Sequence, residues 1–109
     1  MKTKRVKTNV LEYASNVTII VSNYENNNNI YIGIYNNDED ELYNDITANI
    51  MPLSGDYGYI LSTDLETLQF IEEQNIGNST GIEITQGFNT YILYQFNIDD
   101  SFTETYMEG

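Results

Sequence analysis

The segment over residues 63–77 constrains the fold most, because it is the one stretch whose apolar residues recur with helical spacing. Thr63 and Glu66 fit a capping box at its start, and Asn75 and Gly77 are residues that readily end a helix. Glutamate and glutamine side chains occupy the opposite face. The pattern predicts a helix over about residues 64–75 that buries Leu65, Leu68, Phe70, Ile71 and Ile76.

Most of the remaining chain is predicted to form β-strands. Residues 17–24 are rich in β-branched side chains, and residues 30–35 alternate so that their three isoleucines share one face. The asparagine run between these segments predicts a hairpin. Further strands are expected over residues 10–13, 42–51, 57–61, 81–85 and 90–96. Because the apolar side of a lone helix must be buried, we expect an α+β domain, an antiparallel sheet of five to six strands with the helix packed on one face.

The charges are distributed unevenly along the chain. Four basic residues, Lys2, Lys4, Arg5 and Lys7, precede Thr8, and all seventeen carboxylates follow it, which gives a net charge of −13. This distribution predicts a basic flexible N-terminal arm over residues 1–8, a single α+β domain over residues 9–98 and an acidic tail over residues 99–109. Ordinary domains reduce such self-repulsion by interspersing Lys and Arg. We therefore expect the acidity to serve a function.

The composition argues against catalysis. The chain contains neither cysteine nor histidine, so the commonest thiol nucleophile, general base and transition-metal ligand are absent. The acidic residues 36–47 fail as a calcium loop, because Glu41 stands where glycine is needed and Thr47 where glutamate is needed. Among seventeen carboxylates, a pair at glycosidase spacing carries no information. We expect a protein that is not an enzyme and uses no cofactor or metal.

The location of the protein is predicted from its hydropathy. No stretch is apolar and long enough to cross a bilayer, and the first residues lack the apolar core of a signal peptide. The sequence is rich in Asn, Ile and Tyr, as AT-rich genomes tend to encode. We expect a cytoplasmic protein of a bacterial host cell, without membrane contact.

Several short motifs resemble a small domain family that has no established activity. They are the segments YASN at 13–16, TANI at 47–50, FIEE at 70–73, NIG at 75–77, TG at 80–81, GF at 87–88 and YILYQF at 91–96. The similarity covers roughly residues 13–97. The family usually has proline where Ile92 stands and often serine where Gln86 stands. Its members are mostly carried on conjugative elements and phages of gut and other low-GC bacteria, so the resemblance implies a mobile-element context, in which small acidic proteins that disarm host defence are common.

Two classes of function remain open. The first is an acidic DNA mimic, an anti-CRISPR or anti-restriction inhibitor that occupies the basic nucleic-acid-binding surface of a Cas effector, a Cas9-type effector being favoured, or of a restriction complex. Such a protein would not bind nucleic acid itself. Exposed tyrosines beside the acidic residues are candidate anchors, because tyrosine is favoured at interface centres. The candidate partner-binding residues are Asp38, Glu39, Asp40, Glu41, Asp45, Asp64, Glu66, Glu72, Glu73, Tyr35 and Tyr43.

The second class is a non-enzymatic accessory or regulatory protein-binding module of a mobile element, whose acidity only keeps it soluble. A mimic is expected to concentrate its carboxylates on one face, whereas a module is expected to scatter them. The oligomeric state is left open by the sequence.

Overall fold

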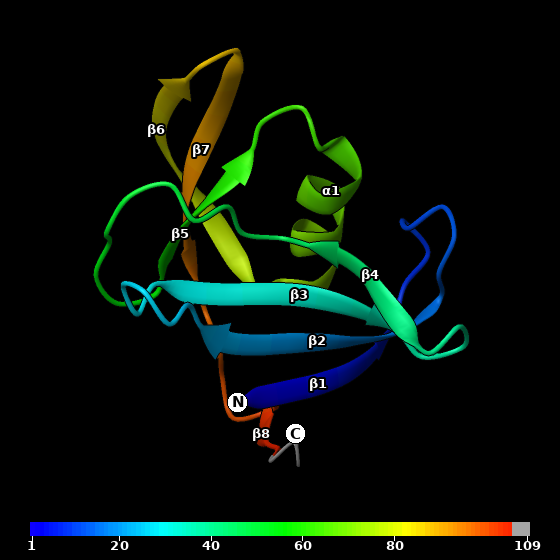
Figure 1. Ribbon diagram of the computed structural model, residues 1–109. Coiled ribbons are helices and arrows are strands. Elements are labelled where there is room, and N and C mark those ends of the chain that lie inside the picture. The colour runs from blue at the N-terminus through cyan, green and yellow to red at the C-terminus, as the bar shows by residue number, and fades with distance from the viewer. Residues whose placement is uncertain (106–109) are drawn as a thin grey trace.

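The computed structural model describes residues 1–105 and confirms the α+β class (Figure 1). The strands form two antiparallel sheets, a five-stranded sheet in the order β4-β3-β2-β1-β8 and a three-stranded sheet in the order β5-β7-β6. No helix within the described part of the chain is long and apolar enough to cross a membrane. The elements are β1 (Lys2–Lys7), β2 (Asn16–Asn23), β3 (Ile30–Asn36), β4 (Glu41–Asp45), β5 (Tyr57–Leu61), α1 (Leu65–Gln74), β6 (Gly77–Gln86), β7 (Asn89–Phe96) and β8 (Thr103–Glu104).

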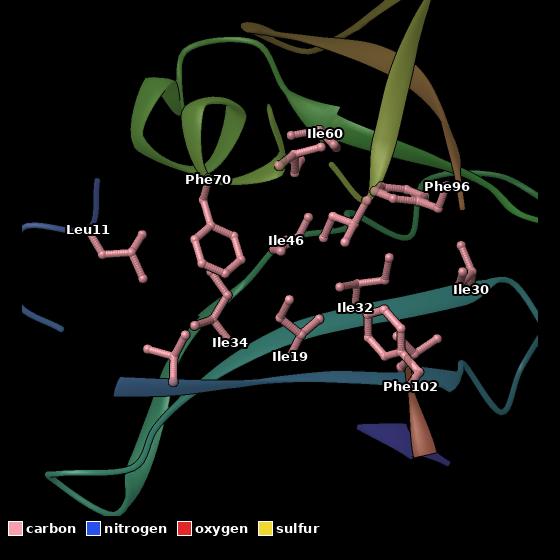
Figure 2. Close-up of a cluster of buried hydrophobic side chains, with 14 residues drawn as sticks. Leu11, Ile19, Ile30, Ile32, Ile34, Ile46, Ile60, Phe70, Phe96 and Phe102 are labelled. Carbon is pink, nitrogen blue, oxygen red and sulfur yellow. The ribbon is translucent and has the colours of Figure 1, made fainter. Parts of the chain in front are cut away.

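The core lies between one face of the five-stranded sheet and a layer formed by α1 and the three-stranded sheet. Figure 2 shows Phe70 pointing from α1 toward Ile34 of β3, and Ile60 and Phe96 entering from β5 and β7. Ile34 is fully buried, as are its neighbours Ile19 and Ile32. The shared face predicted for the isoleucines of residues 30–35 is therefore confirmed.

The predicted hairpin of β2 and β3 is also confirmed. The two strands pair along their length, with Ile19 opposite Ile34 and Val21 opposite Ile32. Asn28 in the connection adopts a left-handed conformation, with φ of 61°. Asparagine tolerates this conformation better than most residues, which explains why an asparagine run turns the chain here.

The expected mobile arm over residues 1–8 is wrong, because residues 2–7 form strand β1. Each residue of β1 pairs with β2, and Val6 packs against the core. The lysines suggested a solvated arm, but lysine is also compatible with a surface strand, because its long stem can lie along apolar surface while its ammonium group stays in water. Lys4 is an example, with its Nζ 5.7 Å from the centre of the Phe102 ring.

The expected acidic tail over residues 99–109 is integrated into the fold up to residue 105. Phe102 is buried in the core, and β8 pairs with β1 through Thr103 and Glu104. A single apolar residue among acidic ones gives no periodic signal, so the sequence did not reveal this packing. Residues 106–109 of the predicted tail lie outside the described residues.

Three of the expected strands differ in the structure, one of them being the strand expected over residues 81–85, which spans Gly77–Gln86 as β6. Residues 10–13 form a loop that places Leu11 in the core. The strand expected over residues 42–51 ends at Asp45, after which Ile46 is buried and Ala48 forms an isolated bridge with Tyr59 of β5. This segment therefore links the two sheets.

The helix is found where it was predicted, but its ends differ in detail. Its N-cap is Asp64, whose carboxylate accepts hydrogen bonds from the backbone and the hydroxyl of Thr67, so the predicted capping box at Thr63 is wrong. Asn75 takes the left-handed position at the C-terminal end, while Gly77 already begins β6. Leu65 is 65% exposed instead of buried, because the buried side of the first turn is formed by Thr67.

Candidate partner-binding surface

The turn between β3 and β4 presents four consecutive carboxylates to solvent. Asp38, Glu39, Asp40 and Glu41 are all exposed. The side chain of buried Asn36 holds the turn from below, because its Oδ1 accepts hydrogen bonds from the backbone N–H groups of Asp38 at 3.1 Å and Glu39 at 3.4 Å. The predicted acidic connection is thus a turn with a fixed backbone and exposed carboxylates, of which Asp38 also accepts hydrogen bonds from the Asn16 amide.

Three tyrosines donate hydrogen bonds to carboxylates beside this turn. Tyr35 donates to Asp40 in the turn. On the same face of β3, Tyr31 donates to Asp45 of β4 at 2.5 Å. Tyr43 donates to Glu66 of α1 at 2.5 Å. The predicted anchors Tyr35 and Tyr43 therefore use their hydroxyl groups within the chain, both are only partly exposed, and Tyr43 also packs against the core.

These bonds favour the neutral form of each phenol. The hydrogen bond to Asp40, then burial, raises the pKa of Tyr35. Burial and then the bond to Glu66 raise the pKa of Tyr43, and burial followed by the bond to Asp45 raises the pKa of Tyr31. All three hydroxyl groups stay protonated at neutral pH, so the negative charge of this surface belongs to the carboxylates alone.

Two glutamates of α1 hold a loop of the same chain. Glu73 accepts hydrogen bonds from the Thr8 hydroxyl at 2.6 Å and from the Asn9 N–H at 3.0 Å, and Glu66 accepts one from the Glu12 N–H at 3.4 Å. Partial burial raises the pKa of Glu73, but these bonds and one from Gln74 outweigh it and leave the pKa lowered. Both side chains were predicted to bind a partner, whereas in the structure they accept hydrogen bonds from residues between Thr8 and Glu12 and hold this segment in place.

Asp64 and Glu72, the other two predicted helix residues, have different surroundings. Asp64 is the helix cap and also accepts a hydrogen bond from Asn44 of β4 at 3.1 Å. Glu72 is exposed and remains available to a partner. Of the four carboxylates predicted on α1, only that of Glu72 has no internal hydrogen bond among the described residues.

The loop over residues 9–15, the β3–β4 hairpin and α1 adjoin one another, and we call this part of the molecule the acidic end. The Tyr43 hydroxyl accepts a hydrogen bond from the Tyr13 N–H at 3.4 Å while donating to Glu66, so one side chain joins all three elements. In Figure 1 the loop and the β3–β4 turn lie at the right, next to β4. The acidic end carries ten of the seventeen carboxylates: Glu12, Asp38, Glu39, Asp40, Glu41, Asp45, Asp64, Glu66, Glu72 and Glu73.

Glu12 is the member of this group that sequence reasoning missed. It lies in a loop without periodic pattern, and its place beside α1 follows from a contact with Glu66, 54 residues later. No local signal in the sequence reveals such a contact.

The carboxylates of the acidic end are not neutralised by ion pairs. Within residues 1–105 the one ion pair joins the amino group of Met1 to Glu104, with the nitrogen 3.3 Å from Oε1. Strand β1, which carries the four basic side chains, borders the acidic end, where the Lys7 carbonyl accepts a hydrogen bond from Gln74 at 3.1 Å. No group of three acidic side chains in the described part of the chain is arranged to hold a metal ion.

Of three comparisons with known proteins, one identifies the family of the chain. The comparison with curated proteins found no match, and neither did the comparison with solved structures. A family described as a domain of unknown function, DUF4313, matches residues 18–108. The match begins within β2 and therefore leaves out β1. Since it covers most of the chain, the protein belongs to the DUF4313 family.

Proposed function

We propose that this protein is an acidic inhibitor that binds the basic nucleic-acid-binding surface of a partner protein in place of DNA. The observation that carries the proposal is the acidic end, where ten carboxylates gather on adjoining elements without an ion pair among the described residues. Eight of these residues are exposed: Glu12, Asp38, Glu39, Asp40, Glu41, Asp45, Glu72 and Glu73.

The charge of the protein is comparable to that of a short piece of DNA. The longest dimension of the molecule is 35 Å, and duplex DNA carries roughly 20 charges over such a length. Sixteen of the seventeen carboxylates belong to the described residues and lie within this extent. A surface of this charge is attracted to a basic channel over a long range, which makes association fast and sensitive to salt.

The partner class that fits best is a nucleic-acid-targeting defence effector, with a Cas9-type nuclease first and a restriction complex second. Such proteins hold their substrates through arginine and lysine side chains in grooves and channels. The mobile-element context implied by the sequence resemblance supports this choice, since inhibitors of host defence benefit such elements. A carboxylate surface satisfies the same basic groups but offers no phosphodiester bond to cleave.

The distribution of the remaining carboxylates favours the second candidate, an accessory protein-binding module. Glu25, Asp56 and Glu83 lie on other parts of the fold, as do Asp99, Asp100 and Glu104. Such a scattered distribution is expected of a module whose carboxylates only keep it soluble. The two candidates differ in whether the acidic end alone determines partner binding.

Removing charge at two places on the surface tests the proposal. The variant Asp38→Asn, Glu39→Gln and Glu41→Gln removes three of the four carboxylates of the turn and keeps Asp40, which accepts the hydrogen bond from Tyr35. The matched control, Glu25→Gln, Asp56→Asn and Asp100→Asn, removes the same charge from exposed positions elsewhere. In a competition assay with purified effectors, we expect the turn variant to inhibit target-DNA binding at least about tenfold less strongly, a loss of roughly 1.4 kcal/mol. The control should inhibit like the unmodified protein.

Two results would contradict the proposal. If the unmodified protein neither blocks target-DNA binding nor alters cleavage by any effector, the accessory module takes its place. Equal losses in both variants would show that total charge, and not the acidic end, is responsible. Saturable binding of the protein to DNA itself in a gel shift at about 150 mM salt would also contradict it, because a DNA mimic repels phosphates.

A further inference from the structure

The hairpin formed by β6 and β7 differs from the rest of this acidic protein in carrying almost no charge. Residues 77–97 contain one charged side chain, that of Glu83. The hairpin extends from the body at the top of Figure 1. Two large apolar side chains on it are exposed, Ile82 at 57% and Phe88 at the tip at 107%. An exposed apolar element of this kind is typical of an interaction site.

Strand β6 is also an edge strand. The three-stranded sheet has the order β5-β7-β6, so within the described residues one side of β6 is paired with β7 and the other is not. The pairing is interrupted by a bulge between Ser79 and Glu83, which protects the first part of the edge. Residues 83–86, with the sequence EITQ, form a regular open edge beyond the bulge.

The turn at the tip shows which backbone groups of β6 are free. Gln86 pairs with Asn89 across the two-residue turn at Gly87 and Phe88, and the residues that flank such a turn exchange both hydrogen bonds. Because the direction of the backbone groups alternates along a strand, Gln86 and Ile84 bond to β7. The N–H and C=O groups of Glu83 and Thr85 therefore point away from β7, toward the open edge.

We propose that β6 pairs with β6 of a second copy of this chain, antiparallel and about a two-fold axis at Ile84, to form a six-stranded sheet. This register sets Glu83 and Thr85 of one copy opposite Thr85 and Glu83 of the other, which pairs the outward-pointing backbone groups of both residues. It also keeps the single carboxylate of the strand from facing its own copy. A shift that centred the axis on Glu83 would place two carboxylates directly opposite each other, which destabilises a sheet.

The same register accounts for the two exposed apolar side chains. Ile82 of one copy lies opposite Gln86 of the other, and Phe88 extends to the bulge around Thr80. The bulge offers room there, since nothing lies within 4 Å of a Cβ added at Gly81. The nearly uncharged hairpin is also where two chains of net charge −13 approach each other with the least repulsion. Raising the salt concentration should therefore strengthen the dimer.

A single cysteine reports the register directly, because the chain has none of its own. In the proposed dimer the two copies of residue 84 form a pair without hydrogen bonds, whose Cα atoms lie about 4.5 Å apart, within the range for a disulfide. Ile84→Cys should therefore give a cross-linked dimer on mild oxidation. Glu83→Cys and Thr85→Cys should stay uncross-linked separately but cross-link when mixed.

Proline at residue 85 tests whether the open edge is used. Thr85→Pro removes an N–H group that points away from β7, so the hairpin keeps its main-chain hydrogen bonds and loses only the side-chain bond between Thr85 and Thr90. By symmetry the dimer loses two main-chain bonds, and we expect its dissociation constant to rise at least about tenfold. The control Thr85→Val removes the hydroxyl but keeps the N–H, and it should dimerise like the unmodified chain. Sedimentation of the full chain at about 0.1 M and 0.5 M chloride measures these constants.

The proposal is overturned if the unmodified chain stays monomeric up to about 1 mM at the higher salt concentration. Cross-linking of Glu83→Cys alone at the rate of Ile84→Cys would also overturn it. Circular dichroism establishes whether Thr85→Pro is folded, and if it is not, the cysteine variants decide. The variant that lacks three carboxylates of the β3–β4 turn should still dimerise, so failure of the dimer and failure of the inhibitor proposal are separate results.

Discussion

Gly33 occupies the centre of β3 because the ring of Tyr31 lies over it. A Cβ added at Gly33 would be 2.3 Å from the Tyr31 hydroxyl oxygen and 2.9 Å from its Cζ atom. The missing side chain lets the tyrosine lie across the sheet and donate to Asp45. This contact connects two strands on the outer face.

The first prediction concerns this pair of residues. Gly33→Ala should destabilise the domain by about 1 kcal/mol, because Tyr31 must swing off the sheet and lose its bond to Asp45. In a Tyr31→Ala background the same change should be neutral or stabilising, since alanine fits a strand better than glycine. Urea unfolding of the four proteins measures the coupling. Additive effects would show that the ring does not depend on the gap at Gly33.

A second prediction concerns the pH dependence of Glu73. The folded state lowers its pKa below the usual value of 4.5, so its stabilising contribution is present above that pH and is lost as the pH falls through the folded-state value. Glu73→Gln should cost about 1 kcal/mol at pH 7, a modest figure because the side chain is largely exposed. The cost should vanish as the pH falls through the folded-state pKa, below which Glu73 is protonated in the unmodified protein as well.

Glu72→Gln is the matched control for this experiment. It removes the same charge from the next residue, which is exposed and contacts none of the loop groups that Glu73 holds. Thermal unfolding at several pH values compares the two variants. An equal cost for both, or a cost for Glu73→Gln that persists at low pH, would assign the effect to net charge instead of to the loop contact.

At the scale of elements, the helix cap provides a third prediction. Asp64→Ala should destabilise the domain by about 1 kcal/mol or more, since it removes the bonds to Thr67 and Asn44. Thr63→Ala should have little effect, because Thr63 is exposed and precedes the cap. Chemical denaturation monitored by circular dichroism compares the two. A larger loss at Thr63 would restore the capping box that the sequence suggested.

Elements with a local pattern could be predicted from the sequence. The β2–β3 hairpin follows from alternating isoleucines and a run of asparagines, and α1 from its helical spacing. Strand β1 could not be predicted in this way, because Val6 is its only large apolar residue. The segment forms a strand because each of its residues pairs with the neighbouring strand β2. The division into two sheets depends on pairings between distant segments, for which single-sequence patterns carry no signal.

The candidate site could be predicted only in part, for the same reason. The exposed turn over residues 38–41 follows from its composition alone. The roles of Glu66 and Glu73 do not, since helical spacing places both on the polar side of α1 without showing that the loop over residues 8–12 contacts them there. A carboxylate that faces water in an isolated helix can face backbone N–H groups in the folded chain.

For the molecule as a whole, a fourth prediction follows from the uneven charge. The net charge is −13, and one ion pair is present among the described residues, so repulsion between carboxylates opposes folding. Sodium chloride should raise the melting temperature by about 5 °C or more, because the Debye length falls from about 10 Å at 0.1 M to about 3 Å at 1 M. Calorimetry across chloride concentrations measures this. A constant or falling melting temperature would mean that the carboxylates are spaced widely enough not to repel.

The pairing of β1 with β8 also determines when the fold can be completed during protein synthesis. The hydroxyl of Thr3 bonds to that of Thr105, 102 residues later, and Phe102 fills the core beneath β1. The ribosome must therefore release nearly the whole described chain before the first strand acquires its second neighbour. Until then Lys2 and Thr3 lack their partner in β8, and the basic side chains along this edge of β1 are expected to oppose pairing between nascent chains. We therefore expect the basic residues of β1 to limit aggregation of the unfinished chain during translation.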